Sequence, residues 1–198
     1  MNLDEIFDIV GKIPGTAGRK YDYVSPLIKV CNMLPDNSTI VEIGSYFGGS
    51  ACVFALTLKE KNVKIYTIDP NFIKPEERPE SWKRYQDCGP YTLDATLSKI
   101  KELGLENYIT CMPGSSEDVL KKWDGTKFDM LYIDGSHQYE DVKVDMLWLQ
   151  HAKPKCILLM DDWIIGVEQA CREQIGMFPG FTQRPNHSFW PMYFTRGY

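Results

Sequence analysis

A glycine-rich segment and an acidic residue further along the chain have the spacing of a nucleoside-binding site. The segment Glu42–Ser50, EIGSYFGGS, follows one apolar run, and Asp69 follows the next. Glycines let a backbone turn tightly and approach a ligand, and the amides that open the following helix face the same point. A carboxylate at Asp69 can accept both hydroxyls of an unphosphorylated ribose. The alternative is that Glu42 and Asp69 are solvated acids at strand ends and bind nothing.

The glycine spacing limits the choice of cofactor. The pattern G-x-x-x-G-G over residues 44–49 differs from the dinucleotide fingerprint G-x-G-x-x-G and from the phosphate loop G-x-x-x-x-G-K-[ST]. It therefore counts against a nicotinamide-dependent oxidoreductase, which remains the alternative enzymatic function at this point.

Short apolar runs that alternate with helical stretches must position these residues. Five runs are predicted as buried strands: Thr39–Ile43, Val63–Ile68, Tyr108–Met112, Phe128–Ile133 and Cys156–Met160. Helices are predicted over Ser50–Glu60, Thr92–Leu103, Ser116–Lys122 and Tyr139–Leu149. The end of the chain, Phe181–Tyr198, is aromatic and is expected to add an antiparallel pair. The pattern predicts the α/β class: one Rossmann-like domain over residues 1–198, with a doubly wound, mostly parallel seven-stranded sheet and an antiparallel C-terminal edge.

Ligands of such sheets bind outside the carboxyl ends of the strands, and every predicted strand is followed there by glycine or polar residues. The residues that follow the strands are Gly44, Asp69, Gly114-Ser115-Ser116, Asp134-Gly-Ser-His137 and Asp161-Asp162. Ser115 and Ser116 also have the features of a helix N-cap, because two acids follow them and favour the helix dipole. The two roles are compatible.

Two motifs, VEIGSYFGGS and YTIDP, resemble the first two motifs of class I S-adenosylmethionine-dependent methyltransferases. The resemblance implies S-adenosylmethionine as cofactor, with the glycine loop under its methionine part, the acid after the second strand on the ribose and the loop after the third strand near the adenine. The cofactor-binding residues implied in this way are Glu42, Gly44, Ser45, Gly48, Ser50, Asp69, Ser115, Ser116 and Asp134.

Two later motifs, FDMLYIDGSHQYEDVKVD and ILLMDDW, are similar to the metal-dependent O-methyltransferase branch. The similarity is to the group of macrolide-sugar O-methyltransferases and cephalosporin-hydroxylase-like proteins. It implies a divalent cation, normally Mg²⁺, at Asp134, Asp161 and Asp162. Because Asp161 and Asp162 are consecutive, the alternative is that one of them supports the ion indirectly. Carboxylates that leave neighbouring strands about 4.8 Å apart can meet at one ion, and Mg²⁺ prefers oxygen ligands. Loop acids without a metal are the alternative.

The same resemblance implies that His137 is the catalytic base, with Asp134 acting through the metal. A metal lowers the pKa of a bound hydroxyl, and a nearby imidazole can take the proton. The implied function is methyl transfer to a hydroxyl of a small molecule, such as a sugar or a natural product. A lone histidine is also often a cap or a packed surface residue. A non-catalytic protein that binds S-adenosylmethionine on the same fold is the remaining alternative.

Three segments have expected roles around this site. Residues 1–37 are expected to form an N-terminal helical cap, in which Gly15–Tyr21 could close over the cofactor. The long irregular stretch 71–91 is expected to be a lid over the acceptor, with a surface excursion as the alternative. The expected acceptor contacts are Trp82, Arg84, Tyr85 and Trp163.

Composition excludes several classes of partner. The net charge of −5 disfavours binding to the nucleic-acid backbone, and no apolar run approaches the roughly 20 residues of a membrane span. The acidic start lacks a signal-peptide pattern, and the six cysteines form no C-x-x-C pair. A reducing, cytoplasmic location is therefore expected. A homo-oligomer could form through the aromatic residues of the tail: Phe189, Trp190, Tyr193, Phe194 and Tyr198.

Overall fold

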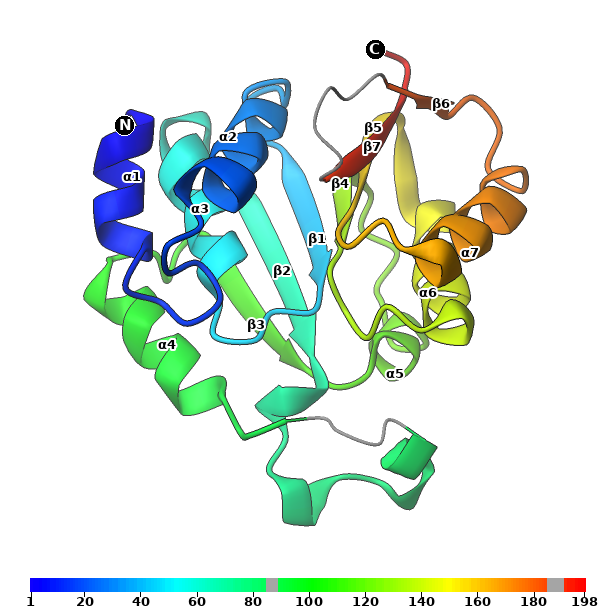
Figure 1. The fold of residues 1–198 in the computed structure, drawn as a ribbon, viewed down its shortest axis with the longest axis horizontal. Helices are drawn as coiled ribbons and strands as arrows, with labels where there is room; N and C mark the ends of the chain where they lie inside the picture. Colours follow the sequence, from blue (N-terminus) through cyan, green and yellow to red (C-terminus); the bar gives the residue numbers. More distant parts are fainter. Residues whose placement is uncertain (85–88, 185–190) are drawn as a thin grey trace.

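A seven-stranded sheet runs through the centre of the protein in its computed structural model, which describes residues 1–84, 89–184 and 191–198. The strand order is β3-β2-β1-β4-β5-β7-β6, and β7 is antiparallel to both of its neighbours (Figure 1). The strands are β1 Thr39–Ile43, β2 Lys64–Asp69, β3 Ile109–Pro113, β4 Phe128–Ile133, β5 Ala152–Met160, β6 Thr182–Gln183 and β7 Met192–Arg196. The predicted fold class is confirmed, including the antiparallel edge.

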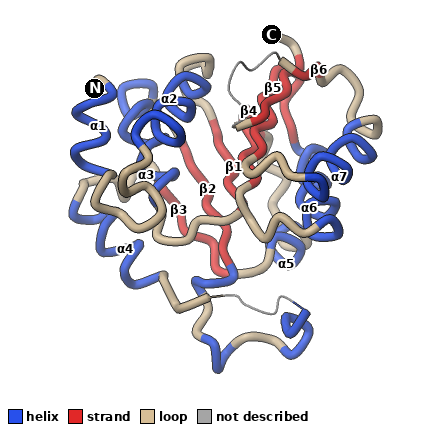
Figure 2. Tube along the Cα trace, viewed as in Figure 1, coloured by secondary structure: helices blue, strands red, loops and turns tan. Residues whose placement is uncertain are grey.

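Helices cover both faces of the sheet (Figure 2). One face carries α1 Leu3–Val10, α2 Ser25–Cys31, α3 Gly49–Leu58 and α4 Leu93–Glu102, and the other carries α5 Ser116–Leu120, α6 Tyr139–Met146 and α7 Ile165–Ile175. Shorter turns are the π-helix η1 Lys20–Val24 and the 3₁₀ segments Lys59–Lys61, Pro70–Phe72, Pro75–Glu77, Glu80–Arg84 and Leu147–His151. None of the helices in the described ranges is long and apolar enough to cross a membrane.

Successive side chains of the central strands point to opposite faces of the sheet, which explains why both faces of the sheet are apolar. Met130 and Tyr132 of β4 point into the core under α3, whereas Leu131 and Ile133 point into the core under α6. Successive side chains of a strand face opposite sides, so a strand between two helical layers must be apolar at every position. All five residues of β1 and all six of β4 are buried, which is why the sequence predicted the bounds of both strands.

Helix α7 was absent from the sequence-based prediction. Its buried residues are Val167, Ala170 and Cys171, spaced as one helical face. Gly166 in the first turn and the exposed Ile165 weaken that pattern. The strand β5 also begins four residues earlier than predicted, at Ala152, where Lys153 pairs with Asp129 at 2.8 Å between Nζ and Oδ2.

The segment after β2 extends away from the sheet below the carboxyl ends of β2 and β3 (Figure 1). It is anchored by Trp82, which is buried and whose indole Nε1 donates to Asp118 Oδ2 at 3.0 Å. Trp82 therefore packs against α5 and lines neither of the two cavities at the end of the sheet. Two other expected contacts, the Arg84 side chain and Tyr85, lie outside the described residues, as do Phe189 and Trp190 of the tail.

The ends of β1 and β4 approach each other closely at Gly44. This glycine has φ +89°, and a Cβ built on it would lie 1.9 Å from the carbonyl oxygen of Asp134. Only a residue without a side chain fits this contact, since an added carbon would overlap backbone atoms. The glycine loop after β1 is thereby held against the first residue after β4.

We expect Gly44→Ala to destabilise the fold far more than Gly104→Ala. Gly104 also has a positive φ, +64°, but nothing lies within 4 Å of its Cβ position. Its substitution should cost about 1–2 kcal/mol from the left-handed backbone alone, and Gly44→Ala should cost roughly 2 kcal/mol more from the collision. Denaturant unfolding of both variants measures the difference. Equal losses would show that the backbone at Gly44 relaxes freely.

Candidate functional site

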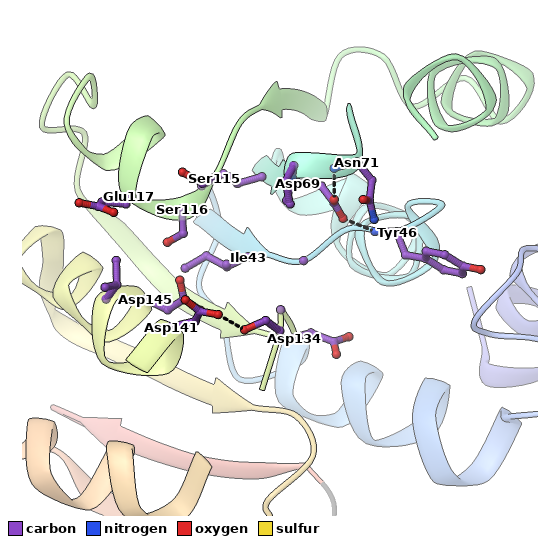
Figure 3. A pocket seen from close by; sticks show the side chains of 16 residues that line it. Ile43, Tyr46, Asp69, Asn71, Ser115, Ser116, Glu117, Asp134, Asp141 and Asp145 are labelled. Atoms are coloured by element: carbon purple, nitrogen blue, oxygen red, sulfur yellow. Dashed lines mark hydrogen bonds between the residues drawn. The ribbon is translucent and has the colours of Figure 1, made fainter. Parts of the chain in front are cut away.

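Two adjoining cavities lie at the carboxyl ends of the strands. The first cavity, of about 260 Å³, lies between the end of β2, the start of α5 and the start of α6 (Figure 3). The second cavity, of about 270 Å³, lies between the glycine loop, the N-terminal segment and the ends of β4 and β5. Gly44, Tyr46 and Asp134 line both cavities. One extended ligand could therefore occupy the two together.

Asp69 ties the loop after β1 to the loop after β2. Its Oδ2 accepts the backbone amides of Ser45 and Tyr46 at 2.7 and 2.6 Å, and its Oδ1 accepts the amide of Asn71 at 2.7 Å (Figure 3). Burial raises the pKa of Asp69 although these amides oppose it. The carboxylate lies on the wall of the first cavity, where its remaining lone pairs can accept from a ligand.

Glu42 lies beneath the glycine loop and lines neither cavity. Its side chain is fully buried and accepts hydrogen bonds from the hydroxyls of Ser50 and Thr67. Burial raises the pKa of Glu42 to about 8. The structure thus gives Glu42 a positioning role, holding the start of α3 against β2.

The predicted loop residues have different positions. Gly48, with φ +76°, caps α3, while Ser45 and Ser50 line the second cavity. The Ser45 hydroxyl is buried and has no hydrogen-bond partner within the described ranges. A buried hydroxyl without a partner is costly, so a ligand in the second cavity could satisfy it.

Ser115 and Ser116 line the first cavity and also begin a helix. The Ser115 hydroxyl accepts the amide of Asp118 at 3.2 Å, which is the N-cap arrangement that the sequence indicated. The Ser116 hydroxyl accepts from the indole Nε1 of Trp148 at 3.0 Å. Both structural roles leave the two serines on the cavity wall.

Asp134 is fixed by two tyrosines. Its Oδ2 accepts from the hydroxyl of Tyr132 at 2.9 Å and from that of Tyr23 at 3.1 Å. Its Oδ1 lies 3.5 Å from Nε2 of His137. The carboxylate therefore has one oxygen held by the two tyrosines and the other beside His137.

Asp161 faces Asp134 from the end of β5. The residue is only 4% exposed, and its Oδ1 has no hydrogen-bond partner in the part of the chain that the structure describes. Burial, reinforced by a hydrogen bond with Asp134 and by the charge of that residue, raises the pKa of Asp161. Asp134, His137 and Asp161 each offer a ligand atom, and these atoms all lie within 4.8 Å of one another. A divalent cation would satisfy this cluster.

Asp162 lies apart from that cluster. Its side chain is 57% exposed, and its Oδ2 lies 3.6 Å from Nδ1 of His137. His137 and Asp162 both have positive φ, +57° and +41°, a backbone conformation that costs energy in non-glycine residues and is concentrated at functional sites. The imidazole thus has Asp162 on one nitrogen and the Asp134–Asp161 pair on the other.

The sequence analysis missed several residues that line the cavities. Tyr23 comes from the N-terminal segment, far from the motifs in sequence, and no local pattern indicates it. Arg19 lies within the Gly15–Tyr21 stretch that was expected near the cofactor, but it was not singled out as a site residue. Asn71 and Tyr46 adjoin predicted residues, so a search of each motif's neighbours could have found them. Trp163, an expected acceptor contact, instead packs near Phe194, with 5.9 Å between ring centroids.

The comparisons with known proteins agree with this architecture. Residues 41–163 match the sequence model of a family described as a methyltransferase domain. No curated protein sequence matches the chain. Because the family match covers more than half of the chain, the chain belongs to this methyltransferase family. With its sheet order it is a class I methyltransferase, the class whose methyl donor is S-adenosylmethionine.

Solved structures with similar folds include three methyltransferases. The SAH-bound methyltransferase PaMTH1 of Podospora anserina has 17% identity and a TM-score of 0.67, over 98% of this chain and 86% of its own. The O-methyltransferase NovP has 13% identity and a TM-score of 0.68, over 88% of this chain and 79% of its own. CalS11, a TDP-rhamnose 3′-O-methyltransferase of calicheamicin biosynthesis, has 16% identity and a TM-score of 0.57, over 99% and 93%. At these identities the likeness establishes the fold.

Glu42→Gln should make the protein more stable at pH 8 than the wild type, with little difference at pH 5. Wild-type Glu42 keeps its proton up to a pKa of about 8 when folded but releases it near 4.3 when unfolded. The wild type therefore loses stability as the pH rises through this window, by an amount on the order of a few kcal/mol, and the glutamine does not. Denaturant unfolding at both pH values measures the effect.

Glu60→Gln is the control, because Glu60 is exposed and its loss should give no such pH-dependent gain. A stability difference between Glu42→Gln and the wild type that stays constant from pH 5 to pH 8 would contradict the assignment of a protonated Glu42.

Proposed function

We propose that this methyltransferase transfers the methyl group of S-adenosylmethionine to a hydroxyl oxygen of a small molecule, assisted by a divalent cation. The observation that carries the proposal is Asp161, a buried carboxylate whose Oδ1 lacks a partner within the described residues and which faces Asp134 beside the cofactor cavity. Methyl transfer alone does not require buried acids at this point, whereas a cation that activates an oxygen does.

The cofactor fits the two cavities in one orientation. The ribose hydroxyls would lie at Asp69, the adenine would extend toward Ser115 and Ser116, and the methionine part would cross Gly44 toward the second cavity. This order follows the acid and glycine chemistry of nucleoside sites. The only described cation on the wall of the second cavity is Arg19, which could meet the methionine carboxylate.

The donor set fits a divalent metal ion. Asp134 and Asp161 would hold the ion, and it would lower the pKa of a hydroxyl bound beside it. Mg²⁺ is the ion we propose, since oxygen donors dominate the set. Asp162, which the resemblance also implicated, would act from the far side of His137 or through water.

His137 would accept the proton of the acceptor hydroxyl. Burial alone would lower the pKa of His137, but the carboxylates of Asp134 and Asp162 outweigh it, so the pKa is raised. Asp162 beside Nδ1 favours a proton on that nitrogen, which leaves Nε2 able to accept. The acceptor oxygen would then attack the sulfonium methyl group, so that the O–CH₃ bond forms as the S–CH₃ bond breaks and S-adenosylhomocysteine leaves.

The acceptor class is proposed from the second cavity and from one similar structure. That cavity is polar and opens beside the acids, which suits a hydroxylated molecule such as a sugar or a natural product. CalS11 is described as a TDP-rhamnose 3′-O-methyltransferase, and it shares the fold with this chain. Membership of a methyltransferase family removes the oxidoreductase alternative, and a turnover assay tests the non-catalytic one.

Calorimetric titration of S-adenosylhomocysteine, first with chelator and then with Mg²⁺, tests the proposal directly. Micromolar binding at one site would support the cofactor site, and methylation of a hydroxylated acceptor that stops with chelator would support the metal. Absence of S-adenosylhomocysteine binding under both conditions would contradict the proposed site. Cofactor binding with no turnover across a broad acceptor set would favour a binding protein.

Asp161→Asn should weaken metal binding and leave cofactor binding intact. The amide matches the carboxylate in shape but lacks its charge, so the affinity for Mg²⁺ or Mn²⁺ should fall by about tenfold to a hundredfold. Metal titration followed by calorimetry, or by Mn²⁺ paramagnetic resonance, measures the loss. Asp129→Asn is the control, because Asp129 is a buried acid paired with Lys153 away from the cavities. Unchanged metal affinity in Asp161→Asn would exclude Asp161 as a ligand.

His137→Asn should lower kcat by about 10²–10⁴-fold while metal and cofactor affinities remain. The amide keeps a polar group at the site but cannot take a proton at neutral pH. Steady-state turnover and metal titration on the same preparation separate the two effects. If metal affinity falls together with kcat, His137 is a ligand of the ion and the base must be sought elsewhere.

A further inference from the structure

A buried carboxylate that the proposed chemistry does not use lies on the wall of the first cavity. Asp145 comes from α6, is 4% exposed, and lies at the end of the cavity opposite Asp69 and Asn71 (Figure 3). Burial raises the pKa of Asp145 to about 7. Burying an ionised carboxylate costs free energy. A ligand that donates a hydrogen bond to Asp145 from the cavity would offset part of that cost.

A chain of hydrogen bonds from Trp148 through Ser116 makes Asp145 a hydrogen-bond acceptor on this wall. The Trp148 indole can only donate, and it donates to the hydroxyl oxygen of Ser116 at 3.0 Å. Ser116 therefore directs its single proton elsewhere, and it is hydrogen-bonded to Asp145. The ionised Asp145 is an acceptor only. This chain of hydrogen bonds thus holds Asp145 as an acceptor at the cavity wall.

The neighbouring part of the wall also presents a hydrogen-bond acceptor. Asp141, one turn earlier on α6, accepts from the Ser136 hydroxyl at 2.6 Å, and no cation is among the described residues that line the first cavity. Ile43, Ile68 and Val144 supply apolar surface to the same cavity, and Ile43 lies between the two polar ends (Figure 3). The cavity suits a flat, uncharged ring with a hydrogen-bond donor on its far edge.

We propose that Asp145 accepts a hydrogen bond from the exocyclic amino group of the cofactor's adenine and makes the site selective for adenine over hypoxanthine. The inference rests on the proposed function, which puts the ribose at Asp69 and the base at the opposite end. Hypoxanthine has a carbonyl oxygen in place of the amine, so two acceptors would face each other without a proton, which costs the full desolvation of both.

Calorimetry with S-adenosylhomocysteine and S-inosylhomocysteine at pH 8, above the raised pKa of Asp145, tests the inference. The wild type should bind the adenosyl ligand about 10- to 100-fold more tightly. Asp145→Asn should bring the two affinities to within a few-fold of each other, because an amide can rotate to accept from the amine or to donate to the carbonyl. Asp141→Asn, which removes a charge from the same cavity, should keep the wild-type preference.

Each outcome has a defined meaning. A wild type that binds both ligands equally, or an Asp145→Asn variant that keeps the wild-type preference, would overturn the role of Asp145 while leaving the proposed function standing. Loss of preference in Asp141→Asn and not in Asp145→Asn would move the role to Asp141. A wild type that binds neither ligand would overturn both proposals. The wild-type comparison needs no variant, so it decides the question even if Asp145→Asn fails to fold.

Discussion

The contact between Gly44 and the carbonyl oxygen of Asp134 sets the geometry of the whole site. It joins the end of β1 to the end of β4 so closely that a single Cβ would overlap the backbone. The glycine loop begins on one side of this contact and the acidic cluster begins on the other. The distance between the loop and the cluster is therefore fixed by two adjacent strands. In the proposed function this would hold the methyl donor close to the activated acceptor, and such proximity is a large part of what an enzyme contributes to a bimolecular reaction.

Buried acids surround that contact, and each has a different means of compensation. Glu42 keeps its proton and accepts from two hydroxyls. Asp69 is balanced by three backbone amides, and Asp134 by two tyrosine hydroxyls. Asp161 shares a hydrogen bond with Asp134, but its Oδ1 has no partner within the described ranges. Buried polar atoms in folded proteins usually have a partner, and in the proposed function the cation would supply one to this oxygen.

The N-terminal segment completes a site that the sheet alone leaves open. Tyr23 reaches Asp134 from 111 residues away in the sequence, and Thr16 and Arg19 line the second cavity beside it. The guanidinium carbon of Arg19 lies 4.5 Å from the centre of the Tyr23 ring, so the N-terminal segment contacts the acidic cluster through one aromatic side chain. Changes near the start of the chain could thus alter the reaction centre without altering any motif residue.

The sequence by itself determined the sheet and the locations of its chemistry. The bounds of β1 and β4, the antiparallel edge, and the gathering of Gly44, Asp69 and Asp134 at one edge follow from apolar periodicity and from what comes after each strand. These are local properties, so they can be read from short windows.

Only the tertiary structure decided which acids face each other and what lies beside them. Asp161 and Asp162 are adjacent and chemically alike, yet one is buried against Asp134 and the other is largely exposed beside His137. The separation arises because the chain turns with a positive φ at Asp162, directly after β5 ends. Tyr23 reaches the site from an N-terminal segment that belongs to none of the motifs, because packing between distant segments, and not local pattern, brings it there. Asp145 ends one of the recognised motifs, but only the structure places it on the cavity wall.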